Sequence, residues 1–200
     1  MTAPGASRPT LVLATANEGK VAELRHLLGD RYHIEPRPPD LADTVEDGET
    51  LESNALKKAR EVARHAGALA VADDTGLFVE GLGGRPGVHT ARYAGPAATA
   101  DDNVDLLLQE LASAGSATGR RAEFRTVIAA VWPDGRELTV AGAVAGSIAP
   151  SRRGSRGFGY DPVFAPLEGD GRTFAEMSAE EKHGLSHRGR AIAALLAALA

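Results

Sequence analysis

The segment from Thr15 to Lys20 places several phosphate-binding groups between a short apolar run and a helix-forming pattern. It supplies a hydroxyl, an amide, a glycine backbone and an ammonium group, and the free N–H groups at a helix N-terminus favour anions. The G-x-x-x-x-G-K-[ST] spacing of a P-loop is absent, and no strand precedes a complete G-x-G-x-x-G fingerprint. These absences disfavour a P-loop NTPase and a Rossmann dehydrogenase, while an ordinary capped turn stays open as the structural interpretation.

Two adjacent carboxylates, Asp73 and Asp74, follow the apolar run Leu69–Ala72. Adjacent carboxylates at a strand end need a counter-charge, and Mg²⁺ with oxygen ligands supplies one. Neighbouring strand residues face opposite ways, so we expect one aspartate to meet the metal and the other to orient it or bind backbone. Glu46, in an acidic loop, is a further candidate ligand. The alternatives are a turn-capping aspartate and a solvated Glu46.

Cationic and donor side chains gather near the C-terminus, downstream of the glycine-rich segment Gly154–Asp161. Phe158 lies between two glycines in this segment, so a planar base could stack on its ring. The alternative is that the Phe158 side chain packs into the hydrophobic core beneath the loop. The cationic and donor residues are Lys182, His183, His187, Arg188 and Arg190. Together with the early loop and the aspartates, they predict a nucleoside triphosphate site without a Walker loop, although such runs also occur as solvated helix faces.

The elements that must position these groups alternate between strands and helices, which predicts an α/β fold with a mixed sheet. Apolar runs and periodicity predict the following elements. Strands are expected at Thr10–Ala14, Tyr32–Glu35 and Leu69–Ala72, with Leu77–Val79 as a candidate continuation, and Ala122–Trp132 and Glu137–Ile148 form a hairpin of a second lobe.

Helix patterns follow three of these strands and close the chain. Thr50 is expected to cap a helix whose Asn54 and Lys58, four residues apart, share one face. Ser178 begins a capping box. A third, amphipathic helix is expected to begin with Asn103–Leu111, after a Thr99–Asp102 cap. The apolar positions of the other helices are Val21, Leu24, Leu27 and Leu28 in the first, Leu51, Ala55, Ala59, Val62 and Ala66 in the second, and Ile192, Leu195, Leu196 and Leu199 in the last.

Composition limits the class of protein. The chain has 200 residues, 43% of them hydrophobic, a net charge of −5 and no cysteine. A core of this size excludes disorder throughout, the negative charge disfavours a nucleic-acid polymer, and disulfides and thiolate sites are excluded. The apolar run 191–200 is too short to span a membrane. We expect a cytoplasmic protein with a flexible tail at residues 1–9 and one domain at 10–200.

Seven motifs in order resemble the non-canonical purine nucleoside triphosphate pyrophosphatases, the inosine/xanthosine triphosphate pyrophosphatase family. They extend from the first predicted strand to the final helix. The motifs are Thr15-x-Asn17-x-x-Lys20, Glu46-x-Gly48 with Asn54-Ala55, Ala72-Asp-Asp-Thr-Gly76, Leu82-Gly-Gly-x-Pro-Gly87, Ala91-Arg-Tyr93, Gly157-Phe-Gly-Tyr-Asp-Pro162 and Ser186-His-Arg188.

The resemblance implies an elongated mixed sheet flanked by helices, with an active site in the cleft between two lobes. It also implies Mg²⁺-dependent hydrolysis of ITP, dITP and XTP to the monophosphate and pyrophosphate, and a homodimer. By resemblance, Asp74 is the catalytic base and a metal ligand, Glu46 assists the metal, and Thr75 touches substrate. The implied substrate-binding residues are Thr15, Ala16, Asn17, Glu18, Gly19, Lys20, Thr75, Phe158, Gly159, Tyr160, Asp161, Lys182, His187 and Arg188.

The chain departs from the family pattern at three positions. Thr75 replaces a common serine, Asp47 a frequent threonine and Ala16 a usual glycine. The change at Ala16 has the largest expected effect on the backbone, because an alanine is strained wherever φ must be positive. Two other functions stay open: a Maf-like pyrophosphatase with another base preference, and a catalytically silent nucleotide-binding module.

Overall fold

The computed structural model describes residues 8–113 and 118–200, which fall into two compact units. Of the described residues, the first unit comprises 8–74 and 128–140, and the second comprises 75–113, 118–127 and 141–200. Most of the predicted tail, residues 1–7, lies outside the described residues. Pro9 is described, and its carbonyl accepts a hydrogen bond from His33 N at 3.0 Å.

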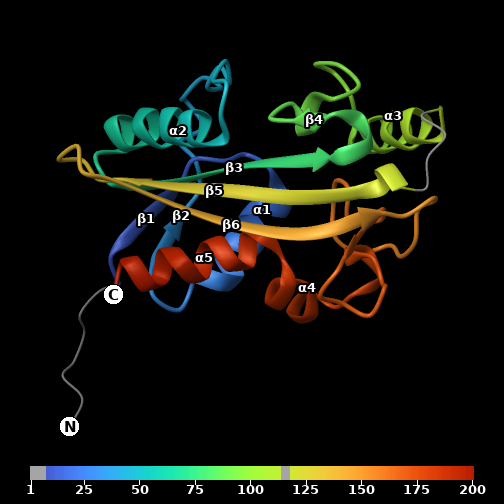
Figure 1. The fold of residues 1–200 in the computed structure, drawn as a ribbon. Coiled ribbons are helices and arrows are strands. Elements are labelled where there is room, and N and C mark those ends of the chain that lie inside the picture. Colours follow the sequence, from blue (N-terminus) through green and yellow to red (C-terminus); the bar gives the residue numbers. More distant parts are fainter. Residues whose placement is uncertain (1–7, 114–117) are drawn as a thin grey trace, which may run out of the picture. The chain divides into compact units, whose positions relative to one another are not determined.

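A seven-stranded mixed sheet confirms the predicted α/β class (Figure 1). Its order is β2-β1-β3-β5-β6-β7, with β4 paired to β3. β1 runs parallel to β2 and β3, whereas β4 and β7 run antiparallel to β3 and β6. The strands are β1 (Thr10–Leu13), β2 (His33–Glu35), β3 (Leu69–Val79), β4 (Pro86–Gly87), β5 (Arg121–Val131), β6 (Glu137–Ile148) and β7 (Phe164–Pro166).

β3 does not end at the paired aspartates, as the sequence had predicted, but continues through them to Val79. Asp73 and Asp74 are both buried within the strand. Lysines compensate both carboxylates, as described below, so the strand can carry two acids without leaving buried charges uncompensated. The candidate continuation Leu77–Val79 is confirmed as part of the same strand.

Two helices of the first unit carry site residues. The helix α1 (Glu18–Leu28) begins after Asn17, and α2 (Leu51–Ala66) begins after the predicted cap Thr50. Figure 1 shows α2 alongside the first part of β3. The predicted apolar face of α2 is right except at its end, where Ala63 is buried and Ala66 is exposed because the helix stops at Gly67 in the left-handed conformation.

The second unit contains α3 (Ala100–Ser113), α4 (Ala179–Leu185) and α5 (His187–Ala198). α3 begins at Ala100 rather than Asn103, because Thr99 and Asp102 cap each other through backbone and side-chain hydrogen bonds. α5 lies against β6 so closely that a side chain at Gly142 would meet the backbone of His187 and Ala191.

The hairpin of β5 and β6 is divided between the units: residues 128–140, including its turn, belong to the first. The hairpin is therefore not confined to a second lobe. Across the residues that the structure describes, no helix has the length and apolar character needed to cross a membrane.

Candidate functional site

The Thr15–Lys20 segment forms the turn that leads into α1. Asn17 N donates to Thr15 Oγ1 at 3.2 Å, and Lys20 N donates to Asn17 Oδ1 at 3.1 Å. The turn is thus shaped by its own side chains and opens the N-terminus of a helix. Ala16 is not strained, because only glycines have positive φ among the described residues.

Each of the paired aspartates has its own lysine. Lys20 Nζ lies 3.2 Å from Asp73 Oδ2, and Lys58 Nζ lies 2.7 Å from Asp74 Oδ1. Asp73 has a fully buried side chain, so its ion pair with Lys20 ties the predicted phosphate loop to the strand. The pairing of the two adjacent aspartates with different lysines fits the prediction that neighbouring strand residues face different surroundings.

Both carboxylate oxygens of Asp74 accept hydrogen bonds. Its Oδ1 accepts from Lys58 and its Oδ2 accepts from Asn54 Nδ2 at 3.4 Å. Burial raises the pKa of Asp74 above the ordinary aspartate value, and the nearby Lys58 ammonium offsets only part of that rise. A buried carboxylate with a raised pKa and a fixed orientation is suited to accept a proton.

Glu46 reaches the same lysine. Lys58 Nζ donates to Glu46 Oε1 at 3.0 Å and to the Asp73 carbonyl at 3.0 Å. Burial alone would lower the pKa of Lys58, but the carboxylates of Asp74, Glu46 and Asp73 outweigh it and raise that pKa. Lys58 therefore stays charged and holds Glu46 and Asp74 together.

Lys58 and Asn54 are functional candidates that were not predicted as site residues, although Asn54 belongs to one of the seven motifs. Their signal was present, because they lie four residues apart on one helical face. Asn54 also accepts from Gly48 N at 2.9 Å, which fastens the acidic loop beside Glu46. A Cβ at Gly48 would lie 2.2 Å from Ser53 Oγ and 2.6 Å from Asn54 Oδ1, so a larger residue there would displace these side chains.

The carboxylates of the first unit are the candidate ligands for a metal ion. Within residues 8–113 and 118–200, no group of three His, Asp or Glu side chains is arranged to hold one. Glu46 and Asp74 come together through Lys58, and Mg²⁺ sites commonly use one or two carboxylates with phosphate oxygens and water. The two carboxylates fit a metal that arrives with a triphosphate.

In the second unit, Phe158 is surrounded by cations. Lys182 Nζ lies 4.7 Å and Arg188 Cζ 5.5 Å from its ring centroid. Phe158 is half-buried, which argues against the alternative that its side chain only fills the hydrophobic core. A base brought against this ring meets N–H donors on two cationic side chains.

Asp161 fixes that arrangement. Its Oδ2 accepts from Phe158 N at 2.8 Å and from Lys182 Nζ at 2.6 Å. Gly157 lies so close that a Cβ there would be 2.0 Å from Asp161 Oδ2, and its φ of 74° also favours glycine. Asp161 thus shapes the turn that begins at Phe158, and it neutralises a buried lysine.

Tyr160 and His187 lie in an aromatic cluster. Tyr160 Oη donates to the Thr90 carbonyl at 2.9 Å, and burial raises the pKa of Tyr160. The His187 ring stacks on Phe124 with centroids 4.5 Å apart. Both side chains are buried, so they support the second unit's core; their predicted contacts with substrate stay predictions.

Arg188 also reaches Thr75. Its Nη2 donates to Thr75 Oγ1 at 3.2 Å, and Thr75 Oγ1 lies 2.7 Å from Thr126 Oγ1. Thr126 is fully buried and was not predicted as a site residue. No local spacing could have found it, because the two threonines are 51 residues apart.

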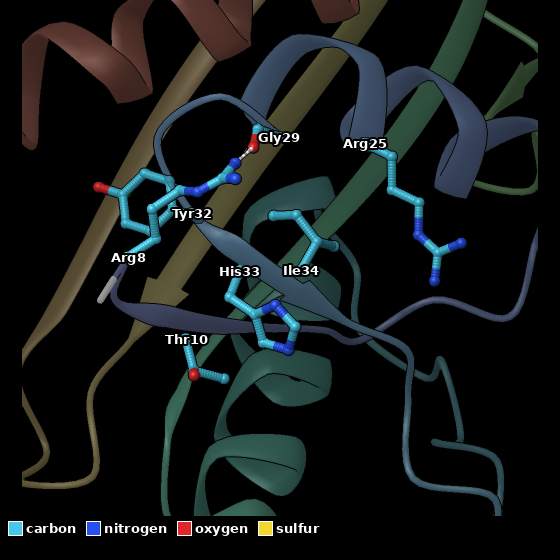
Figure 2. A pocket seen from close by; sticks show the side chains of 7 residues that line it. All are labelled: Arg8, Thr10, Arg25, Gly29, Tyr32, His33 and Ile34. Atoms are coloured by element: carbon cyan, nitrogen blue, oxygen red, sulfur yellow. Dashed lines mark hydrogen bonds between the residues drawn. The ribbon is translucent and has the colours of Figure 1, made fainter. Parts of the chain in front are cut away.

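A pocket of about 540 Å³ lies elsewhere on the first unit, near β2 (Figure 2). None of its lining residues belongs to the predicted site. Arg8 donates to the Gly29 carbonyl there, while the Arg25 guanidinium points away from that bond. The lining residues are Arg8, Thr10, Arg25, Gly29, Tyr32, His33 and Ile34.

Comparison with known proteins gives consistent matches. The model of the Ham1 family matches residues 11–198. The dITP/XTP pyrophosphatase of Methylococcus capsulatus is 48% identical over 197 residues, covering 96% of each chain. That of Symbiobacterium thermophilum is 47% identical over 191 residues, covering 95% of this chain and 94% of the relative. The solved HAM1 protein of Coxiella burnetii has a TM-score of 0.85 at 38% identity, covering 96% of this chain and 98% of that one.

Proposed function

The chain belongs to the Ham1 family, and on this basis we propose that it hydrolyses ITP, dITP and XTP to the nucleoside monophosphate and pyrophosphate. The observation that carries the proposal is the buried Asp74 carboxylate, held between Lys58 and Asn54 with a raised pKa. Asp74 is the catalytic base. Removal of these triphosphates cleanses the cytoplasmic nucleotide pool.

The reaction begins with a water molecule whose oxygen attacks the α-phosphorus. Asp74 orients this water and accepts its proton. The bond between the α-phosphorus and the oxygen that bridges to the β-phosphorus breaks, and pyrophosphate leaves with the bond's electron pair. Lys20 neutralises charge on the leaving group, while Lys58 keeps Asp74 and Glu46 in place.

Asp74 and Glu46 would hold Mg²⁺ together with phosphate oxygens of the substrate. When bound, the metal supplies charge neutralisation on the phosphates. Thr15 to Lys20 bind the triphosphate: Thr15 offers a hydroxyl, and the segment Ala16–Gly19 offers backbone N–H groups at the start of α1.

Base selectivity comes from the second unit's donors. We assign stacking to Phe158 and the reading of the purine 6-keto oxygen to Arg188, with Lys182 beside it. A 6-amino group instead presents N–H donors to these donors. Each unsatisfied buried polar group costs about 1–3 kcal/mol, so adenine nucleotides are disfavoured. Gly159, Tyr160, Asp161 and His187 complete the base and sugar contacts by resemblance.

By the same resemblance the protein is a homodimer, with the segment around Arg92 and Tyr93 as the proposed contact. Size-exclusion chromatography with light scattering tests this. A mass corresponding to a single chain at micromolar concentration would contradict the proposed dimer.

Product analysis tests the function. The protein is incubated with ITP, dITP, XTP, GTP or ATP and Mg²⁺, and pyrophosphate and orthophosphate are measured separately. We expect pyrophosphate first, with ITP, dITP and XTP preferred, and no turnover without Mg²⁺. Asp74→Asn is the matched inactive control, since it keeps the size of the side chain. A different preferred base favours a Maf-like enzyme, and binding without hydrolysis favours a silent module.

A further inference from the structure

We propose that Thr126 is a positioning residue that sets base specificity, because its buried hydroxyl fixes Thr75 and, through Thr75, the guanidinium of Arg188. The inference rests on the proposed function, in which Arg188 reads the 6-keto oxygen. It adds a residue that does not touch the substrate but determines how well the base is read.

The first observation is the burial of the hydroxyl. Thr126 is 0% exposed and lies on β5 between the buried residues Phe124 and Ile128 of the same strand face. A hydroxyl in such surroundings needs a hydrogen-bond partner. Its partner is Thr75 Oγ1, at 2.7 Å.

The second observation is the direction of the hydrogen bonds. A guanidinium can only donate, so Thr75 Oγ1 accepts from Arg188 Nη2 at 3.2 Å. Thr126 then either accepts the Thr75 proton or donates to the remaining lone pair. In both cases Thr126 restrains the rotation of the Thr75 hydroxyl and keeps its acceptor directed at Arg188.

The third observation is the position of Arg188 itself. This side chain is 2% exposed, and its Cζ lies 5.5 Å from the Phe158 ring centroid. Arg188 therefore extends from Thr75 on β3 to the ring on which we place the base. Without a fixed acceptor at Thr75, the guanidinium loses one of the contacts that orient it toward a base oxygen.

This arrangement predicts an effect that depends on the substrate's 6-position. Thr126→Val removes the hydroxyl and keeps a β-branched side chain that suits a strand. We measure kcat/KM for ITP and for purine riboside triphosphate, which lacks the 6-oxygen. We expect a loss of roughly 10-fold with ITP, equivalent to about one misplaced buried hydrogen bond, and less than about 2-fold with the analogue.

Thr126→Ser restores the hydroxyl and is expected to stay within about 2-fold of wild type on both substrates. If Thr126→Val does not fold, the pair Thr126→Ser and Thr126→Ala replaces it, because both lack the methyl group and differ in the hydroxyl alone. Thermal unfolding of each variant verifies the fold.

Two results would overturn the inference: an equal loss on both substrates, which indicates a purely structural threonine, and no loss on either. These outcomes differ from a failure of the proposed function. If the wild-type protein hydrolyses neither substrate, the proposed function falls and the inference with it. If the wild type is active and Thr126→Val keeps full preference for the 6-keto base, the inference alone is wrong.

Discussion

Lys58 Nζ lies 2.7 Å from Asp74 Oδ1, and the two side chains are only 10% and 8% exposed. The same ammonium lies 3.0 Å from Glu46 Oε1. One buried cation therefore compensates two carboxylates of the proposed catalytic centre, and its own pKa is raised by them. This ion pair compensates the buried Asp74 carboxylate and offsets part of the rise that burial causes in the pKa of Asp74.

Replacing Lys58 by methionine is expected to destabilise the protein. The change leaves Asp74 buried without its cation, and removing one partner of a buried ion pair typically costs about 3–5 kcal/mol. Urea unfolding measures the loss. Lys57→Met is the matched control, since Lys57 pairs with the exposed Asp47 and such pairs contribute up to about 1 kcal/mol. Equal, small losses in both variants would contradict the role given to Lys58.

Replacing Asp161 by asparagine is expected to weaken substrate binding. The change removes the negative charge of the carboxylate whose Oδ2 accepts hydrogen bonds from Lys182 Nζ and Phe158 N. The Phe158 ring and the neighbouring Lys182 cation are then held less firmly. We expect KM for ITP to rise roughly 10-fold with a smaller change in kcat. Steady-state kinetics measure both, with the exposed Asp170→Asn as control. A fall in kcat at constant KM would argue against this assignment.

The Glu181 carboxylate predicts a pH-dependent stability. Hydrogen bonds from Arg172 and from Ser178 N lower the pKa of Glu181 from 4.5 to about 2. Because the pKa is lower in the folded state, the ionised Glu181 stabilises the fold above pH 4.5, and this contribution is lost as the pH falls toward about 2. The Glu181→Gln variant should therefore be less stable than the wild type at neutral pH and as stable as the wild type near pH 2. Denaturant unfolding across this range decides, and a difference that grows on acidification would refute the prediction.

Ala16→Gly tests the departure in the phosphate loop. Ala16 does not have positive φ, so glycine relieves no strain there. We expect unchanged kcat and KM for ITP and a stability lower by about 0.4–1 kcal/mol, because glycine increases the entropy of the unfolded chain. A gain in stability or activity would show that the alanine is strained.

Local patterns predicted the elements well where the signal lay within a few residues. The caps at Thr50 and Ser178 and the shared face of Asn54 and Lys58 follow from spacings of three or four residues. Local patterns failed where the outcome depended on distant partners. The strand containing Asp73 and Asp74 continues because Lys20 and Lys58, from two separate helices, compensate the carboxylates.

The candidate site shows the same division. The motifs pointed to Asp74, Phe158 and Arg188, whose residue types reveal their chemistry. They could not reveal that His187 stacks on Phe124, or that Arg188 donates to Thr75, since these contacts join segments far apart in the chain. The sequence of a histidine followed by an arginine is the same whether the histidine ring contacts substrate or packs in the core.

Hydrolysis of ITP in water enriched in oxygen-18, in the presence of Mg²⁺, tests the central claim most directly. Mass spectrometry locates the heavy oxygen in the products. Attack on the α-phosphorus with Asp74 as base predicts the label in the monophosphate, none in pyrophosphate, and loss of the reaction in Asp74→Asn. Label in pyrophosphate, release of orthophosphate as the first product, or near-normal turnover by Asp74→Asn would contradict the account.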